Sequence, residues 1–152
     1  MAVHIARPVD ARLVRDMLND FFDQRSIEYK PQTLQRIRQR FGYNVVWVQD
    51  EEPHAFVMLR LHQEEVEIAG LFPRGMLRSR LKPVLVAAIR DVYQRFPQAG
   101  SQRVWAEFPF TDDLGEGECL AWRSEWPQGV LMVSQPKPGM LWVIESTLER
   151  LV

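Results

Sequence analysis

The feature that most constrains the fold of this chain is a long helical repeat between two strand-like segments. Six apolar residues recur at helical spacing between positions 77 and 96, namely Leu77, Leu81, Leu85, Ile89, Val92 and Phe96. The segments Glu65–Phe72 and Val104–Phe108 on either side of this repeat have the length and composition of strands. A strand, a helix and a strand in this order form a crossover, whose two strands lie parallel in one sheet. The chain is therefore predicted to contain a parallel pair of strands.

The N-terminal part predicts a short strand and two amphipathic helices. The strand covers His4–Arg7 and ends at Pro8, and Asp10 is placed to cap a helix over Ala11–Asp23. A second helix is predicted between Pro31 and Gly42, because glycine commonly ends a helix. The apolar faces predicted for the two helices consist of Leu13, Val14, Met17, Leu18, Phe21 and Phe22, and of Leu34, Ile37 and Phe41.

The remaining segments complete a mixed sheet. Three strands, Tyr43–Gln49, Ala55–Leu61 and Glu65–Phe72, are predicted to form an antiparallel meander. An acidic loop over Thr111–Glu118, a short helix over Cys119–Trp126 and a hairpin of Val130–Ser134 with Met140–Ile144 are predicted to follow. The predicted fold class is α/β, with a mixed α+β sheet that is mostly antiparallel, one parallel pair that splays apart, and about four flanking helices. Residues 1–152 are predicted to form one domain.

Composition excludes several classes of partner and site. The formal net charge is −1, so the chain as a whole does not favour nucleic acid, and Arg36, Arg38 and Arg40 diverge by about 200° per pair on a helix. The longest apolar stretches are too short to cross a membrane. Cys119 is the one cysteine, so no intrachain disulfide can form and a cytoplasmic location is expected. The three histidines lack metal-ligand spacing relative to Cys119, so no metal site is predicted.

The order of these elements resembles the GNAT superfamily of N-acyltransferases over nearly the whole chain. The opening Ile5-Ala6-Arg7-Pro8-Val9-Asp10 resembles the first strand of that family and the helix cap after it. Glu67-Ile68-Ala69-Gly70-Leu71-Phe72 resembles its fourth strand, and Arg74-Gly75 resembles the start of its cofactor signature. The resemblance implies that acetyl-coenzyme A enters a gap between the fourth and fifth strands, with its pyrophosphate at a helix N-terminus.

The resemblance also implies which residues hold the cofactor. They are Leu71, Phe72, Arg74, Gly75, Leu77, Arg78, Ser79 and Arg80. Arg74, Arg78, Arg80 and Lys82 place four cations near the phosphates, although the same charges could be ordinary solvated surface. Three features depart from the family pattern: Leu77 stands where a small residue is expected, the loop after Phe72 is short, and Pro83 predicts a helix that begins only near Lys82.

Acyl transfer to an amine needs a base, and Glu67 and Glu107 are the candidates, although both carboxylates could instead simply point to solvent. Glu107 is expected to be partly buried among Trp105, Phe108 and Phe110. Trp122 stands roughly where many family members carry a tyrosine that protonates the leaving thiolate. Trp122 and Trp126 form either core or a partner-binding patch, and the acidic loop either attracts an amine or is only solvated.

Two functions remain open from the sequence. The first is a GNAT-like N-acyltransferase that moves an acetyl group from acetyl-coenzyme A to a primary amine, on a small molecule or a protein. The second is a catalytically inactive GNAT-fold module with a structural or interaction role, such as a phage or virion component. A homo-oligomer or a larger assembly is compatible with either function.

Overall fold

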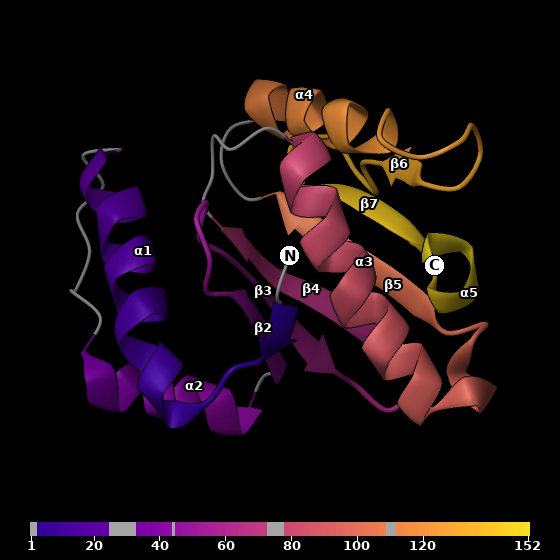
Figure 1. The fold of residues 1–152 in the computed structure, drawn as a ribbon. Coiled ribbons are helices and arrows are strands. Elements are labelled where there is room, and N and C mark those ends of the chain that lie inside the picture. Colours follow the sequence, from indigo (N-terminus) through magenta and orange to yellow (C-terminus); the bar gives the residue numbers. More distant parts are fainter. Residues whose placement is uncertain (1–2, 25–32, 44, 73–77, 109–111) are drawn as a thin grey trace. The chain divides into compact units, whose positions relative to one another are not determined.

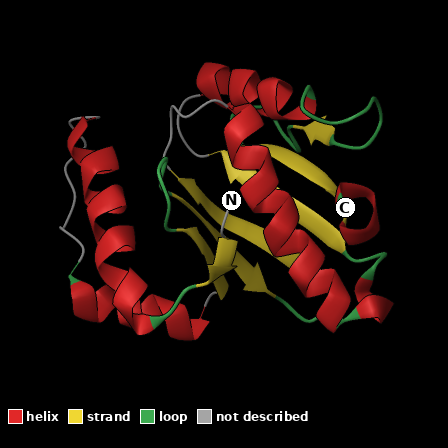
Figure 2. Ribbon diagram, in the orientation of Figure 1, coloured by secondary structure: helices red, strands yellow, loops and turns green. Residues whose placement is uncertain are grey.

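The computed structural model describes residues 3–24, 33–43, 45–72, 78–108 and 112–152. Figures 1 and 2 show helices and strands that are interspersed along the chain. In chain order the elements are β1 (Val3–Ile5), η1 (Pro8–Asp10), α1 (Ala11–Gln24), α2 (Leu34–Tyr43), β2 (Val45–Gln49), β3 (Ala55–Leu61), β4 (Glu65–Phe72), α3 (Arg78–Arg95), η2 (Pro97–Ala99), β5 (Arg103–Phe108), α4 (Asp112–Arg123), β6 (Met132–Ser134), β7 (Trp142–Thr147) and α5 (Leu148–Leu151). Within the described ranges, no helix combines the length and hydropathy that a membrane crossing requires.

The strands form one sheet in the order β1-β2-β3-β4-β5-β7-β6. β1 pairs with β2, β2 with β3, β5 with β7, and β6 with β7, all antiparallel. β4 and β5 are parallel, with Glu65 opposite Arg103 and Glu67 opposite Trp105. The predicted fold class is therefore confirmed, including the parallel pair that the crossover requires.

The contacts divide the chain into two compact units. The first unit comprises residues 1–60 and 69–85. In it, α1 packs against α2 and buries Val14 and Leu18, while α2 buries Ile37. The rings of Phe56 on β3 and Phe72 on β4 stack with their centroids 4.9 Å apart. The apolar rows predicted for the first two helices thus include buried core residues.

The second unit comprises residues 61–68 and 86–152. α4 packs against β5, β6 and β7, and α5 packs against β7. Val104, Ala106 and Phe108 alternate with more exposed residues along β5 and are buried. This period of two puts one face of β5 in the core and leaves the other face for polar side chains.

The segment predicted as an acidic loop is part of a helix. α4 begins at Asp112, so most of Thr111–Glu118 is helical. A Cβ at Gly115 would lie 3.1 Å from Cδ1 of Trp142 and 3.3 Å from the Phe108 carbonyl oxygen. Glycine therefore serves close approach of the helix to β5 and β7, rather than marking a loop.

The helix predicted to begin near Lys82 begins at Arg78 instead, and Pro83 lies inside it. Proline at this position removes a hydrogen bond to the carbonyl four residues earlier, at a cost of about 3 kcal/mol in a helix interior. Burial of Leu81, Leu85, Ile89 and Val92 on one helix face offsets this cost. The prediction that Pro83 makes the helix begin near Lys82 is therefore wrong, and the start of α3 is not a departure from the family pattern.

Candidate functional site

Charged side chains share one face of the strands β4, β5 and β7 in the second unit. The register aligns Glu65 with Arg103, and it aligns Glu67 with Trp105 and then Glu145. Residues opposite one another on neighbouring strands point to the same face of the sheet. This face therefore carries three carboxylates around one guanidinium and one indole ring.

Arg103 ties the three strands together. Its Nη1 donates to Oε2 of Glu65 at 3.3 Å, and its Nε donates to Oε2 of Glu145. Its guanidinium carbon lies 5.3 Å from the centre of the Trp105 ring. Partial burial lowers the pKa of Arg103, but the bonds and charges of Glu145 and Glu65 raise it above its ordinary value. Glu65 and Glu145 are thus neutralised in part by Arg103.

Glu67 is the candidate base that the structure places in a defined setting. Its side chain is 21% exposed, and its Oε1 lies 3.1 Å from Nε2 of His62. The His62 amide donates to the Glu65 carbonyl at 2.9 Å, which closes the tight turn between β3 and β4. His62 was not predicted as a site residue. The contact between His62 and Glu67 depends on the turn between β3 and β4, which brings the two side chains together.

Glu107 does not have the burial that was expected. It is exposed, because the alternation of β5 puts Glu107 and Trp105 on the polar face and Phe108 on the core face. Phe110 lies outside the described residues. Glu67 is therefore the better-positioned carboxylate of the two.

The predicted cofactor residues fall into three groups. Leu71 and Phe72 are buried at the end of β4, where Phe72 stacks on Phe56. Arg74, Gly75 and Leu77 lie outside the described residues. The third group is Arg78, Ser79 and Arg80, which form the first turn of α3. The side chains of Ser79 and Arg80 are exposed.

Neither Trp122 nor Cys119 offers an acid or a nucleophile. Trp122 is 1% exposed, and its Nε1 donates to Oε1 of Glu118 at 3.3 Å. Burial, aided by the charge of Glu118, raises the pKa of Cys119 to about 12. A thiol with this pKa stays protonated at neutral pH, so Cys119 is a core residue.

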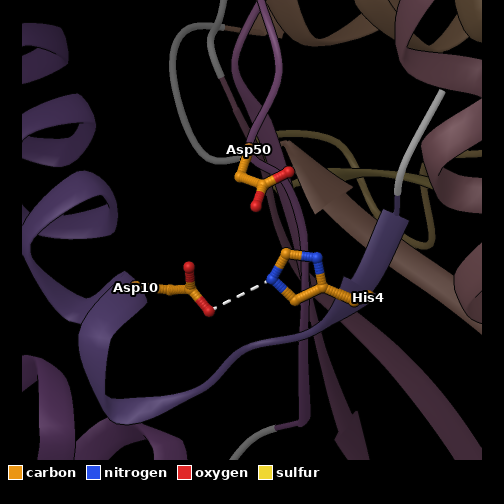
Figure 3. A group of neighbouring side chains, drawn as sticks. All are labelled: His4, Asp10 and Asp50. Atoms are coloured by element: carbon orange, nitrogen blue, oxygen red, sulfur yellow. Dashed lines mark hydrogen bonds and ion pairs between the residues drawn. The ribbon is translucent and has the colours of Figure 1, made fainter.

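One group of side chains in the described part of the chain comes close enough to hold a metal ion. It consists of His4, Asp10 and Asp50 in the first unit, with ligand atoms within 4.8 Å of one another (Figure 3). Arg7 already pairs with both carboxylates, at 3.2 Å from Asp10 and 3.6 Å from Asp50. A divalent cation would have to displace this guanidinium, so the group is an ion-pair network.

The side chain of Asp10 was expected to cap the following helix, but it bonds to residues that precede it in the chain. Its Oδ2 accepts from the backbone amide of Arg7 at 2.7 Å and from the Arg7 Nε at 3.2 Å, and it lies 3.2 Å from Nε2 of His4. The carboxylate thus turns back toward β1 and locks the corner between β1 and α1. Burial raises the pKa of Asp10, but the hydrogen bonds of Arg7 and His4 and the charge of Arg7 outweigh it and lower the pKa below 3.8.

Replacement of Asp10 by asparagine is expected to destabilise the protein in a pH-dependent way. At neutral pH the loss should be about 1–3 kcal/mol, because a buried carboxylate loses charged hydrogen-bond partners. The pKa of Asp10 is lower in the folded state than in the unfolded state. The ionised carboxylate therefore stabilises the fold at pH values well above 3.8, and this stabilisation is lost as the pH falls through the lowered pKa. The difference between the two proteins should therefore shrink toward acid in denaturant unfolding from pH 7 to pH 3. Asp16→Asn is the control, since Asp16 pairs with Arg15 at an exposed site; a pH-independent gap for Asp10→Asn would contradict the assignment.

No protein-family model and no curated protein sequence matches this chain. Solved structures do match it. A ribosomal-protein-alanine N-acetyltransferase from Brucella melitensis has a TM-score of 0.68 at 14% identity, covering 97% of this chain and 99% of that one. The PaiA N-acetyltransferase from Thermoplasma acidophilum, solved in complex with coenzyme A, has a TM-score of 0.68 at 10% identity, covering 97% and 99%.

A third match is to an enzyme whose name states an amine substrate. A variant of the spermidine N-acetyltransferase SpeG from Vibrio cholerae has a TM-score of 0.65 at 8% identity, covering 100% of this chain and 98% of that one. Identities this low establish a common fold and leave activity to the residues of the site.

Proposed function

We propose that this chain, which has the fold of the GNAT N-acetyltransferases, transfers an acetyl group from acetyl-coenzyme A to a primary amine. The observation that carries the proposal is the match to N-acetyltransferases over 97% or more of the chain, one of them bound to coenzyme A. These proteins are also covered almost completely, which supports one domain over residues 1–152. Glu67 supplies the carboxylate that the reaction needs.

The corner from β4 to α3 fits an anionic cofactor. α3 begins at Arg78 and has no acidic residue in its first turn, while Ser79 and Arg80 are exposed there. The amides of a helix N-terminus attract phosphate groups, and an anion would relieve the poor placement of a cation at that end of the dipole. Leu71, Phe72, Arg74, Gly75, Leu77, Arg78, Ser79 and Arg80 are the residues that would hold acetyl-coenzyme A.

Acetyl-coenzyme A supplies the acetyl group as a reactive thioester. Glu67 accepts the proton that the amine loses as its nitrogen bonds to the acetyl carbon and the carbon–sulfur bond breaks. His62 holds the Glu67 carboxylate in place through the 3.1 Å contact. Glu65 and Glu145 share this face with Glu67, but both pair with Arg103, so Glu67 is the carboxylate left to receive a proton from the acceptor.

The departing thiolate leaves without help from Trp122. The indole is buried and donates to Glu118, so it has no proton to offer a substrate. A thiol with an ordinary pKa near 8.5 is a stable enough leaving group to depart as the anion. The absence of a tyrosine at this position therefore slows the reaction without preventing it.

Acetyl-coenzyme A is expected to stabilise the protein against unfolding. A ligand at 100 times its dissociation constant adds about 2.7 kcal/mol, which thermal unfolding with increasing cofactor measures directly. Arg80→Ala should weaken the effect because Arg80 lies in the first turn of α3, whereas Arg95→Ala, at the last turn of α3, is the matched control. No stabilisation at millimolar cofactor would remove the enzyme proposal and leave the inactive module.

A further inference from the structure

A cavity of about 340 Å³ opens in the second unit, and its lining includes none of the residues proposed to hold the cofactor. Its size is at the lower end of the range for small-molecule sites. It is lined by the turn between β3 and β4, by β4, by the end of α3 and by the segment that leads into β5. The lining residues are Leu61, His62, Gln63, Val66, Val92, Phe96, Gln98 and Gln102.

The apolar part of the lining combines a buried floor with an exposed aromatic ring. Val66 and Val92 are 2% and 4% exposed, whereas Phe96 is 52% exposed. Phe96 was predicted as the last residue of the helical apolar repeat, but it lies just beyond the end of α3 and lines the cavity. An exposed ring beside a concave apolar surface is a place where a flat ligand can stack.

The polar part of the lining consists of three glutamine amides and one histidine ring. Gln63, Gln98 and Gln102 each carry an amide with both a donor and an acceptor. The fourth polar residue, His62, faces the Glu67 carboxylate through Nε2. Apart from His62, which already faces Glu67, the lining residues have no ionisable side chain. A charged ligand would lose its hydration here without gaining a counter-ion.

We propose that this cavity binds an uncharged planar ring with an amide-like edge, such as a nucleobase or an aromatic carboxamide. The ring stacks on Phe96 above Val66 and Val92, and the edge exchanges hydrogen bonds with the glutamine amides. Arrangements of this kind, an aromatic face with glutamine side chains, read the donor and acceptor pattern of bases in other proteins. This proposal does not depend on the proposed acetyl transfer, although His62 both lines the cavity and contacts Glu67.

Benzamide and benzoate form a matched pair of probes because they share the same ring. Benzamide carries a neutral amide with N–H donors, whereas benzoate carries a negative carboxylate without a donor. The full chain is titrated with each compound while NMR follows the side-chain amide signals of its glutamines. Saturable shifts at Gln63, Gln98 and Gln102 are expected with benzamide, and at least tenfold weaker binding is expected with benzoate. Equal binding of the two compounds, or no saturable shift with benzamide at millimolar concentration, overturns the proposal.

Phe96→Ala tests the stacking directly and is expected to weaken benzamide binding at least tenfold. The variant should remain folded because Phe96 is half exposed, which thermal unfolding verifies. Met132→Ala is the matched control, since Met132 is 55% exposed and does not line this cavity. Unchanged affinity in Phe96→Ala overturns the proposal. Displacement of benzamide by acetyl-coenzyme A also overturns it, because the cavity would then belong to the cofactor.

Discussion

Replacement of Glu67 by glutamine is expected to lower kcat for acetyl transfer by about 10²–10⁴-fold, the usual contribution of a positioned base. Glutamine keeps the size of the side chain and can still contact His62, but it cannot accept the amine proton. Binding of acetyl-coenzyme A should persist, because Glu67 is not among the residues proposed to hold the cofactor. Initial rates with a primary amine such as spermidine, together with cofactor-induced stabilisation, measure the two effects separately.

Glu107→Gln is the matched control for this prediction. Glu107 lies on the same face as Glu67, two residues beyond the position of Trp105, but it is exposed. Its replacement should leave kcat close to that of the unchanged protein. A reversed result, with loss of transfer only in Glu107→Gln, would make Glu107 the base. If both variants retain full activity, neither carboxylate is the base.

Local patterns in the sequence predicted the bounds of two strands and the parallel pair of strands correctly. The strands Ala55–Leu61 and Glu65–Phe72 have the predicted bounds, because their apolar, strand-favouring residues and the polar turn between them are local features of the sequence. The parallel pair followed from the long helical repeat between two strands. Each of these predictions needed no knowledge of which side chains meet across the sheet.

The predictions that failed concern features that distant residues decide. Gly115 reads locally as a loop signal, whereas its contact with Trp142 shows that it lets α4 approach the sheet. Pro83 reads as a helix start, whereas burial of the α3 face extends the helix before it.

The polar contacts of the candidate site depend even more on distant residues. Arg103 meets Glu65 and Glu145 across 38 and 42 residues of chain. Such contacts depend on strand register, which the sequence pattern alone does not determine. Glu67 could be identified as a candidate from its strand, but its setting beside His62 and Trp105 could not.

The burial of Trp122 predicts the largest loss of stability. Trp122→Ala is expected to cost about 3–5 kcal/mol, the range for removing a large aromatic side chain from a core. The side chain is 1% exposed, its ring centroid lies 6.1 Å from that of Trp126, and it lies on the helix that packs against β7. For a chain of this size the loss corresponds to a fall in Tm of about 6–20 °C.

Two variants separate the packing of Trp122 from its other possible roles. Trp122→Phe keeps most of the buried ring and loses the bond to Glu118, so its destabilisation should be clearly smaller than that of Trp122→Ala. Leu120→Ala, on the same helix at a position 38% exposed, should have only a small effect. If Trp122→Ala unfolded at the same temperature as the parent while losing acetyl transfer, Trp122 would belong to the catalytic machinery. The indole would then have to reach the leaving thiolate, which its burial and its bond to Glu118 argue against.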